Sequence, residues 1–407
     1  MRKPIAAAAL VALVSLLSLG AGTAGATSRT WVVDDDGFAT PGHCNATAPA
    51  PMSINVAIAA ASPGDKIQVC PGTYPERVVV DKALTLVGDT ASLSRSTCVA
   101  GTGGTNSATD TIVNGIDVKS NSVTIKNFTS QNAQYPAAGG PAPGIQVGTP
   151  AENWVKLQNN VIQGNLMGVY LNGDHDSVLG NCIRNNNAAG SASGSGIYSD
   201  QGLTNSTIGR NNFTGHTNVA VNVIGSSTFP VWDVTITLNN AIKDSTIMVI
   251  GVNDVDITRN VSRNSLYNGI QVDEPNTVPV SNDVDVENNS ISSCGFSGIQ
   301  LFGSRHSDVQ GNNVRNCVDR GIGLRLGSNA DGAAWNQIDH NTLRNNGTNG
   351  IEAVLLTHDN RFERNSATGN ATWDCLDSST GTKTAGTANT WVNNLGPKAS
   401  PPAICHH

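Results

Sequence analysis

Ionisable residues that could carry acid–base chemistry follow a short motif, a glycine and then alternating apolar residues, that recurs along the chain. The candidates are Asp200, Asp273, Arg305, His306 and His175. A lyase acting on a uronic acid needs a cation to neutralise the substrate carboxylate and a base for the adjacent proton. Asp200, Asp273, Arg305 and Arg325 could serve the first role, the acids through a bound calcium ion, and His175, His306 or a tyrosine could serve the second.

A glycoside hydrolase would instead need two carboxyl groups about 5 to 9.5 Å apart. Asp200 and Asp273 belong to repeats that are three units apart, roughly 14 Å at the spacing of neighbouring strands. Asp174 stands one unit before Asp200 and leaves such a pair open. Asp176 precedes the next apolar stretch, where aspartate commonly forms turns, so we assign it a structural role.

Residues that alternate with the apolar ones in this motif should point outward and form columns of amides, acids and aromatic rings. Amides can bond to sugar hydroxyls and aromatic faces can pack on sugar rings, so the columns predict a polysaccharide-binding strip. The alternative is that these are ordinary solvent-facing polar residues and that Arg325 is simply the ion-pair partner of Glu352. The predicted strip consists of Tyr170, Asn172, Tyr198, Gln271, Gln300, Phe302 and Arg325.

A second motif, an apolar residue, two spacers, Asn, one spacer and another apolar residue, returns every 20 to 30 residues. The variable period suits a coil with loops of different length. Strands of three to five residues cannot bury a core alone, so successive units must stack, about 4.8 Å apart, with one Asn over the next. These register asparagines are Asn160, Asn181, Asn211, Asn240, Asn260, Asn289, Asn312, Asn341 and Asn365.

The repeats predict an all-β chain that forms a single right-handed parallel β-helix, or β-solenoid. We expect the asparagine ladder to be structural, because stacked amides can pair with each other and with turn backbone groups. The glycine that opens the first motif, as at Gly168 and Gly196, should supply a bend or a positive φ at a corner.

Composition restricts the location and partners of this 407-residue chain. Residues 1–26 resemble a cleaved secretory signal, with Arg2 and Lys3 before an apolar stretch and Ala24-Gly25-Ala26 after it. Its removal leaves 22 basic and 31 acidic residues, a net charge of about −9. We therefore expect a secreted, extracellular monomer with no membrane span after cleavage and no nucleic-acid partner, since phosphate binding needs a basic face.

Eight cysteines follow the signal, and an even number in an exported chain points to disulfides. Cys294 and Cys317 each stand five residues after a register asparagine, which predicts a bridge between adjacent coils, with two stacked thiols as the alternative. Cys44–Cys70 would tie down the first coil and Cys375–Cys405 would close the tail. The partners of Cys98 and Cys182 are left open.

The two ends of the coil should carry caps, because an open sheet edge recruits other chains. Ser53 can cap a short helix through Ala61 that covers the first coil. We expect a long loop or irregular coil at 91–110. The predicted organisation is a signal peptide at 1–26, an N-terminal cap with the first coils at 27–110, the β-helix at 111–372 and a disulfide-closed C-terminal cap at 373–407.

The stretches 54–69, 71–76 and 82–88, together with the repeats, resemble the right-handed parallel β-helix proteins of the pectin-lyase-like superfamily. The resemblance covers most of residues 50–395. It implies a secreted protein that binds an extracellular, acidic polysaccharide, and cleavage of that polysaccharide by a lyase or hydrolase reaction is compatible with the resemblance. The superfamily also includes members without known catalysis.

Two other functions stay open. A non-catalytic surface or adhesion protein is favoured by the absence of the acidic signatures of polygalacturonases and the Arg-centred signatures of pectate lyases. A metal-handling role is suggested by similar repeats in periplasmic proteins that assist copper loading of nitrous oxide reductase. Against it, no cluster of His, Met and Cys is visible in the sequence.

Overall fold

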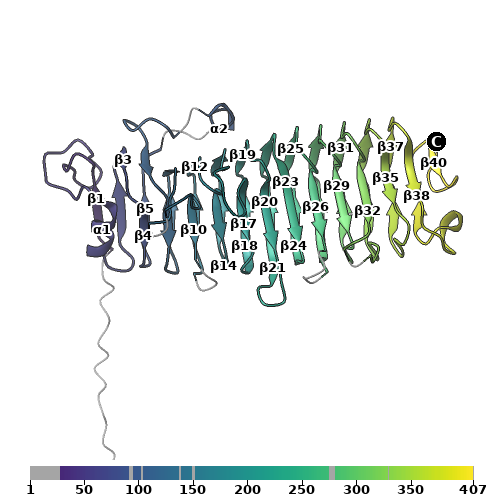
Figure 1. Ribbon diagram of the computed structural model, residues 1–407, viewed down its shortest axis with the longest axis horizontal. Coiled ribbons are helices and arrows are strands. Elements are labelled where there is room, and N and C mark those ends of the chain that lie inside the picture. The colour runs from purple at the N-terminus through teal and green to yellow at the C-terminus, as the bar shows by residue number, and fades with distance from the viewer. Residues whose placement is uncertain are drawn as a thin grey trace, which may run out of the picture.

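The computed structural model describes residues 28–90, 95–101, 104–136, 139–148, 152–274, 280–328 and 330–406. Three parallel sheets run along one elongated coil, with β1 at one end and β40 at the other (Figure 1). The predicted all-β, right-handed parallel β-helix is confirmed. The predicted signal peptide lies outside the described residues. None of the helices in the described part is long and apolar enough to cross a membrane.

Most coils contribute one strand to each sheet, in the order sheet I, sheet II, sheet III, while one coil contributes two short strands, β14 and β15, to sheet I. Sheet I contains β1 (Thr30–Val33), β2 (Lys66–Val69), β5 (Thr85–Val87), β8 (Thr124–Lys126), β11 (Lys156–Gln158), β14 (Gly173–Asp174), β15 (Ser177–Leu179), β18 (Leu203–Gly209), β21 (Val231–Thr237), β24 (Asn253–Thr258), β27 (Asn282–Glu287), β30 (Asp308–Gln310), β33 (Gln337–Asp339), β36 (Arg361–Glu363) and β39 (Thr390–Val392).

Sheet II contains β3 (Gly72–Tyr74), β6 (Thr111–Val113), β9 (Thr129–Gln131), β12 (Val161–Gln163), β16 (Cys182–Arg184), β19 (Asn212–Thr214), β22 (Asn240–Ile242), β25 (Val261–Arg263), β28 (Ser290–Ser292), β31 (Asn313–Arg315), β34 (Thr342–Arg344) and β37 (Ser366–Thr368).

Sheet III contains β4 (Val78–Val80), β7 (Ile116–Val118), β10 (Ile145–Val147), β13 (Val169–Leu171), β17 (Ser195–Ser199), β20 (Val219–Ile224), β23 (Ser245–Ile250), β26 (Ile270–Asp273), β29 (Ile299–Phe302), β32 (Ile322–Arg325), β35 (Asn349–Ala353), β38 (Trp373–Asp377) and β40 (Ala399–Ser400). Strand pairing thus continues through the predicted cap boundaries at residues 110 and 372.

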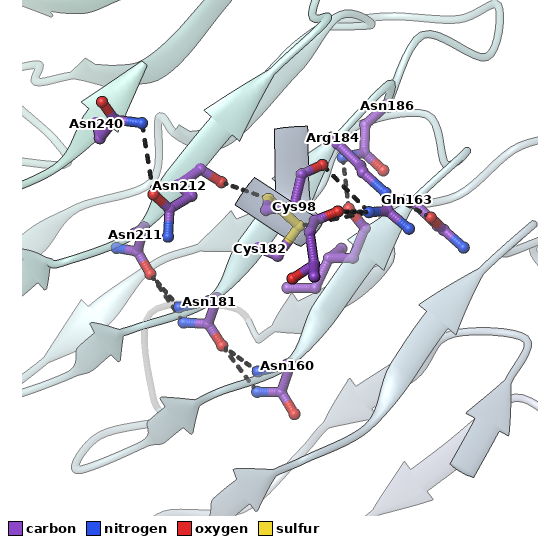
Figure 2. Close-up of a disulfide and its surroundings, with 12 residues drawn as sticks. Cys98, Asn160, Gln163, Asn181, Cys182, Arg184, Asn186, Asn211, Asn212 and Asn240 are labelled. Atoms are coloured by element: carbon purple, nitrogen blue, oxygen red, sulfur yellow. Dashed lines mark hydrogen bonds between the residues drawn. A yellow bond between two sulfur atoms is a disulfide. The ribbon is translucent and has the colours of Figure 1, made fainter. Parts of the chain in front are cut away.

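The asparagine ladder occupies the corner where sheet I turns into sheet II. The Asn160 side chain donates to Oδ1 of Asn181 at 3.0 Å and to the carbonyl of Ile125 at 3.1 Å, and Oδ1 of Asn181 also accepts the backbone N–H of Asn160. In this pattern the side-chain amide groups have their hydrogen-bond donors and acceptors paired, and the pattern repeats from coil to coil (Figure 2). The predicted member Asn240 is wrong by one residue, because Asn239 bonds to Asn211 while Asn240 starts β22.

The glycines that open the sheet III strands serve close packing. Gly168 and Gly196 do not have positive φ, which rules out one of the two roles that we expected for them. A Cβ on Gly168 would lie 2.4 Å from the carbonyl oxygen of Gly196 on the next coil. One on Gly196 would lie 2.5 Å from the carbonyl oxygen of Ala220. These positions therefore require glycine because the backbones of neighbouring coils approach too closely for a side chain.

The N-terminal end is capped by α1 (Ile54–Ala60), as predicted. The Ser53 hydroxyl accepts the N–H of Val56, and Ile54 and Ile58 pack on the coil. The 91–110 segment differs from our expectation of a loop, because it contains α2 (Arg95–Ala100) on the outside of sheet II. A 3-10 helix, η1 (Thr384–Gly386), interrupts the tail.

Four disulfides are present, and the three predicted pairs, Cys44–Cys70, Cys294–Cys317 and Cys375–Cys405, are confirmed. The fourth joins Cys98 in α2 to Cys182 in β16. Beside it, the buried Arg184 donates to the carbonyl of Cys98 and to Gln163 (Figure 2). The disulfide and Arg184 together fasten α2 to sheet II.

Candidate functional site

Two tyrosines and one aspartate meet on the outer face of sheet III. Tyr170 in β13 and Tyr198 in β17 occupy paired positions on neighbouring coils, and their rings stack with centroids 6.1 Å apart. The Tyr170 hydroxyl donates to Oδ1 of Asp200 at 2.8 Å, and the Tyr198 hydroxyl donates to Oδ2 at 3.2 Å. The Asp200 carboxylate therefore fixes the positions of both tyrosine hydroxyl groups on the outer face of the sheet.

These three residues form the floor of a cleft of about 460 Å³. Tyr135, Pro141 and Pro143 contribute one part of its lining, and residues 190–192 contribute another. Leu166 and Met167 add apolar surface. Both wall segments connect sheet II to sheet III, so loops at that corner convert an otherwise flat strip into a concave site.

The environment keeps both phenols protonated. Burial, and then the hydrogen bond to Asp200, raise the pKa of Tyr170 well above its ordinary value. Burial and the Asp200 charge raise the pKa of Tyr198 to about 12. A phenol that holds its proton this tightly is a hydrogen-bond donor at neutral pH, which disfavours the assignment of either tyrosine as a lyase base.

Asn172, which we predicted to contact substrate, is fully buried. Its Oδ1 accepts the Ser199 hydroxyl at 3.2 Å and the backbone N–H groups of Asp200 and Gln201. It lies under the turn that carries Asp200, so its contribution to the site is to position that carboxylate.

The rest of the predicted strip is in register but outside this cleft. Gln271 lines a smaller hollow of about 120 Å³ with Met248 and Tyr267, and its Nε2 donates to Asp273 at 2.9 Å. Asn222 and Met248 fill the same column between Tyr198 and Gln271. These two residues do not belong to a recognisable motif in the sequence, because β20 and β23 lack the glycine that opens it.

Farther along sheet III, long side chains cover the strip. Gln300 is 1% exposed, and the Arg320 side chain lies against the neighbouring Gly323. Arg325 binds Glu352 at 2.9 Å, which confirms the ion pair considered from the sequence. Phe302 is partly buried at the paired position of Arg325, so neither residue faces the tyrosine cleft.

Arg305, His306 and His175 lie at a different edge, the corner where sheet III turns into sheet I. His306 stacks on Trp335 with ring centroids 5.6 Å apart, and Arg305 lies over the same ring and near Asp331. His175 stacks on Trp154, far along the coil. The structure therefore does not bring the predicted catalytic residues Asp200, Asp273, Arg305, His306 and His175 into one cleft.

The distance between these histidines also argues against a metal site that they share. His175 and His306 are five coils apart, about 24 Å at the strand spacing. In the described part of the chain, the single three-residue group with metal-binding geometry is Asp34, Cys44 and Cys70, whose sulfurs are joined in a disulfide. Asp200 is the one carboxylate among the described residues lining the cleft, so those residues do not form a calcium cage there.

Comparisons with known proteins agree with this architecture. The family model described as "Right handed beta helix region" matches residues 231–395. No curated protein matches the sequence.

Among solved structures, the chain is similar to the catalytic domain of a GH87 alpha-1,3-glucanase in complex with tetrasaccharides, with a TM-score of 0.59, 14% identity and coverage of 84% of this chain and 66% of that domain. It is also similar to the A-module of the Azotobacter vinelandii mannuronan C-5 epimerase AlgE6, with a TM-score of 0.52, 14% identity and coverage of 85% of this chain and 91% of that module.

A third similar structure is the Dettilon tailspike protein, with a TM-score of 0.60, 14% identity and coverage of 89% of this chain and 68% of that one. This protein therefore has the right-handed parallel β-helix fold. The chain spans about two thirds of the glucanase domain and of the tailspike, and at this level of identity the likeness concerns the fold.

Proposed function

We propose that this protein binds a neutral polysaccharide in the cleft on sheet III, through Tyr170, Tyr198 and Asp200. The observation that carries the proposal is the convergence of two stacked phenols on one carboxylate inside a concave site. The carboxylate can accept hydrogen bonds from sugar hydroxyls, while the tyrosine rings, Leu166 and Met167 offer apolar surface to the sugar ring. Proteins with this fold that act on polysaccharides, an alpha-1,3-glucanase and a mannuronan C-5 epimerase, support a polysaccharide as the ligand.

The charge of the cleft favours a neutral sugar over the acidic one expected from the resemblance. Its described lining contains Asp200 and no Lys, Arg or His. A uronate carboxylate brought next to Asp200 would meet a like charge without a counterion, in a partly desolvated site. Sugar hydroxyls carry no such penalty.

Binding without cleavage suits the same residues. A glycoside hydrolase needs two carboxyl groups that face one site; Asp200 is the one carboxylate among the described residues that line this cleft, and Asp174 lines a separate hollow with Thr204 and Phe229. A lyase needs a base, and both phenols are held in the protonated form. We therefore place the protein among the non-catalytic carbohydrate-binding β-helices.

An extracellular location is part of the proposal. Four disulfides and no free cysteine in the described chain are typical of proteins that fold in an oxidising compartment. Polysaccharides of cell walls and matrices are met in the same environment.

The test is oligosaccharide binding, measured by calorimetry after a screen of neutral α- and β-glucan fragments, with a matched pair of variants. Asp200→Asn removes the charge that accepts both phenols and should weaken binding about 10- to 100-fold, because hydrogen bonds to a charged group are worth about 1.5–3 kcal/mol. Asp273→Asn makes the same chemical change three coils away and should leave affinity within about twofold.

Equal losses in the two variants would refute the assignment of the cleft. So would a wild-type protein that binds none of the neutral glucans. Release of reducing ends or of unsaturated products that depends on Asp200 would overturn the non-catalytic part of the proposal.

A further inference from the structure

On the outer face of sheet II, α2 covers two of the strands, β16 and β19. It is held there by Cys98–Cys182 (Figure 1). The strands β25, β28, β31 and β34 continue the sheet beyond this cover. Their outward side chains therefore form a flat surface along the axis of the coil.

One outward column of this surface carries arginine on three of four successive coils. Arg263 pairs with Ser292, Ser292 with Arg315, and Arg315 with Arg344 in the strand register. At the strand spacing of about 4.8 Å, Arg315 and Arg344 are direct neighbours, and Arg263 lies two spacings from Arg315. All three arginine side chains are exposed.

None of the three arginines forms an ion pair with a described residue, unlike Arg320 and Arg325 on sheet III. The adjacent outward column is uncharged and mostly polar. Its members are Val261, Ser290, Asn313 and Thr342. No acidic residue occupies either outward column of these four strands, so the positive charge is not compensated on its own face.

The neighbouring face has the opposite sign over the same coils. On sheet I, Asp256 pairs with Asp285, and Asp308 follows on the next coil. Burial and repulsion from the Asp308 and Asp256 charges raise the pKa of Asp285 to about 6. An anionic chain would be repelled from sheet I and directed to sheet II, although the molecule as a whole is acidic.

We propose that the column Arg263, Arg315 and Arg344 on sheet II is a second binding surface, which takes a linear anionic polysaccharide lying along the coil axis. Guanidinium groups form bidentate bonds with carboxylate or sulfate groups, and the flanking hydroxyl and amide side chains can bond to sugar hydroxyls. Duplex DNA presents about one charge per 1.7 Å of its axis, much denser than this column. A polymer with charges one or two sugars apart is the better match.

The experiment measures retention of the disulfide-bonded protein on immobilised polygalacturonate, with dextran and duplex DNA as comparison polymers. The triple variant Arg263→Gln, Arg315→Gln, Arg344→Gln should bind polygalacturonate about tenfold more weakly, because three exposed ion pairs are lost. The charge-matched control Lys126→Gln, Lys156→Gln, Arg210→Gln changes basic residues outside the column and should stay within about twofold of wild type. Raising the salt to 1 M, where the screening length is about 3 Å, should release the wild type.

Asp200→Asn separates this surface from the cleft on sheet III. It should leave polygalacturonate retention unchanged even if it abolishes neutral-sugar binding. Equal weakening by the two triple variants, no retention of the wild type, or retention by DNA as strong as by polygalacturonate would each overturn the assignment. Retention lost with Asp200→Asn would place the anionic chain in the cleft and would equally refute it.

Discussion

Asp176→Asn should stabilise the protein, and more so as the pH rises. Asp176 is 2% exposed at the corner between sheets III and I. Its Oδ1 accepts the backbone N–H of Val155 at 2.8 Å, while Oδ2 has no partner among the described residues. Burial, and then the nearby charges of Asp174 and Glu152, raise the pKa of Asp176 to about 8 from an ordinary value of 3.8.

The sign of the effect follows from linkage. Below pH 4 the carboxyl is protonated in both states, and its contribution to stability is fully present. Between pH 4 and 8 the unfolded chain releases the proton while the folded protein retains it, so stability falls by about 1.4 kcal/mol per pH unit. At pH 7 the accumulated loss is about 4 kcal/mol, and Asp176→Asn should recover most of it.

Asparagine also fits this corner. The equivalent positions on later coils are Asn336 and Asn360, whose side chains donate to the carbonyls of Ser304 and Ala333. An asparagine at 176 would keep an acceptor for the Val155 N–H and present a donor where the uncharged acid now has a proton.

The assay is urea unfolding at pH 5, 7 and 8.5, with Asp254→Asn as the control. Asp254 is an exposed aspartate at the same corner, and its substitution should change stability by less than about 0.5 kcal/mol. For Asp176→Asn the gain should rise from about 1.5 kcal/mol at pH 5 to about 4 at pH 7. A gain that does not change with pH, or one that Asp254→Asn matches, would refute the reasoning.

Three further outcomes are expected. Asn289→Ala removes hydrogen bonds to Asn260, Ile257 and Asn312, and it should lower the free energy of unfolding by about 3–5 kcal/mol because buried partners are left unsatisfied. The control is Asn313→Ala, exposed on β31, which should change the free energy of unfolding by less than about 0.5 kcal/mol in the same urea assay. Replacing Cys98 and Cys182 with Ala opens an 84-residue link and should lower stability by about 2–5 kcal/mol, with faster hydrogen exchange confined to α2 and the strands beneath it. Asp285→Asn should stabilise more at pH 8 than at pH 5, because burial and the neighbouring aspartates raise the pKa of Asp285 to about 6 and its penalty grows as the pH rises through that value; an equal gain at both pH values would contradict this.

Periodicity made most of the coil predictable from the sequence. A register asparagine is recognisable because its two flanking apolar residues must both point inward, which is a local requirement. The prediction was wrong at Asn240, whose flanking residues would be Thr237 and Ile242; Asn239 has the buried apolar residues Ile236 and Ala241 at the required spacing and enters the ladder instead. The same local logic correctly aligned Tyr170 with Tyr198, and Gln271 with Gln300.

The cleft was not predictable because its walls are not periodic. Residues 190–192 and the segment around Tyr135 carry no repeat, so the sequence could place the tyrosines on one face but not show that this face is concave. α2 escaped notice for a related reason. It is six residues long and is held by the bond from Arg184 and by Cys98, contacts with residues more than 80 positions away.

Alternation along a strand determines which residues point outward, but long neighbouring side chains determine which outward residues are exposed. Gln300 points outward and is nevertheless buried near Arg320, whose own charge is paired with Glu352. Arg315 points outward on sheet II and remains exposed and unpaired. A column read from the sequence is therefore only a candidate binding surface. We propose such surfaces at two places on this protein, on sheet III where loops wall the strip and on sheet II beyond α2.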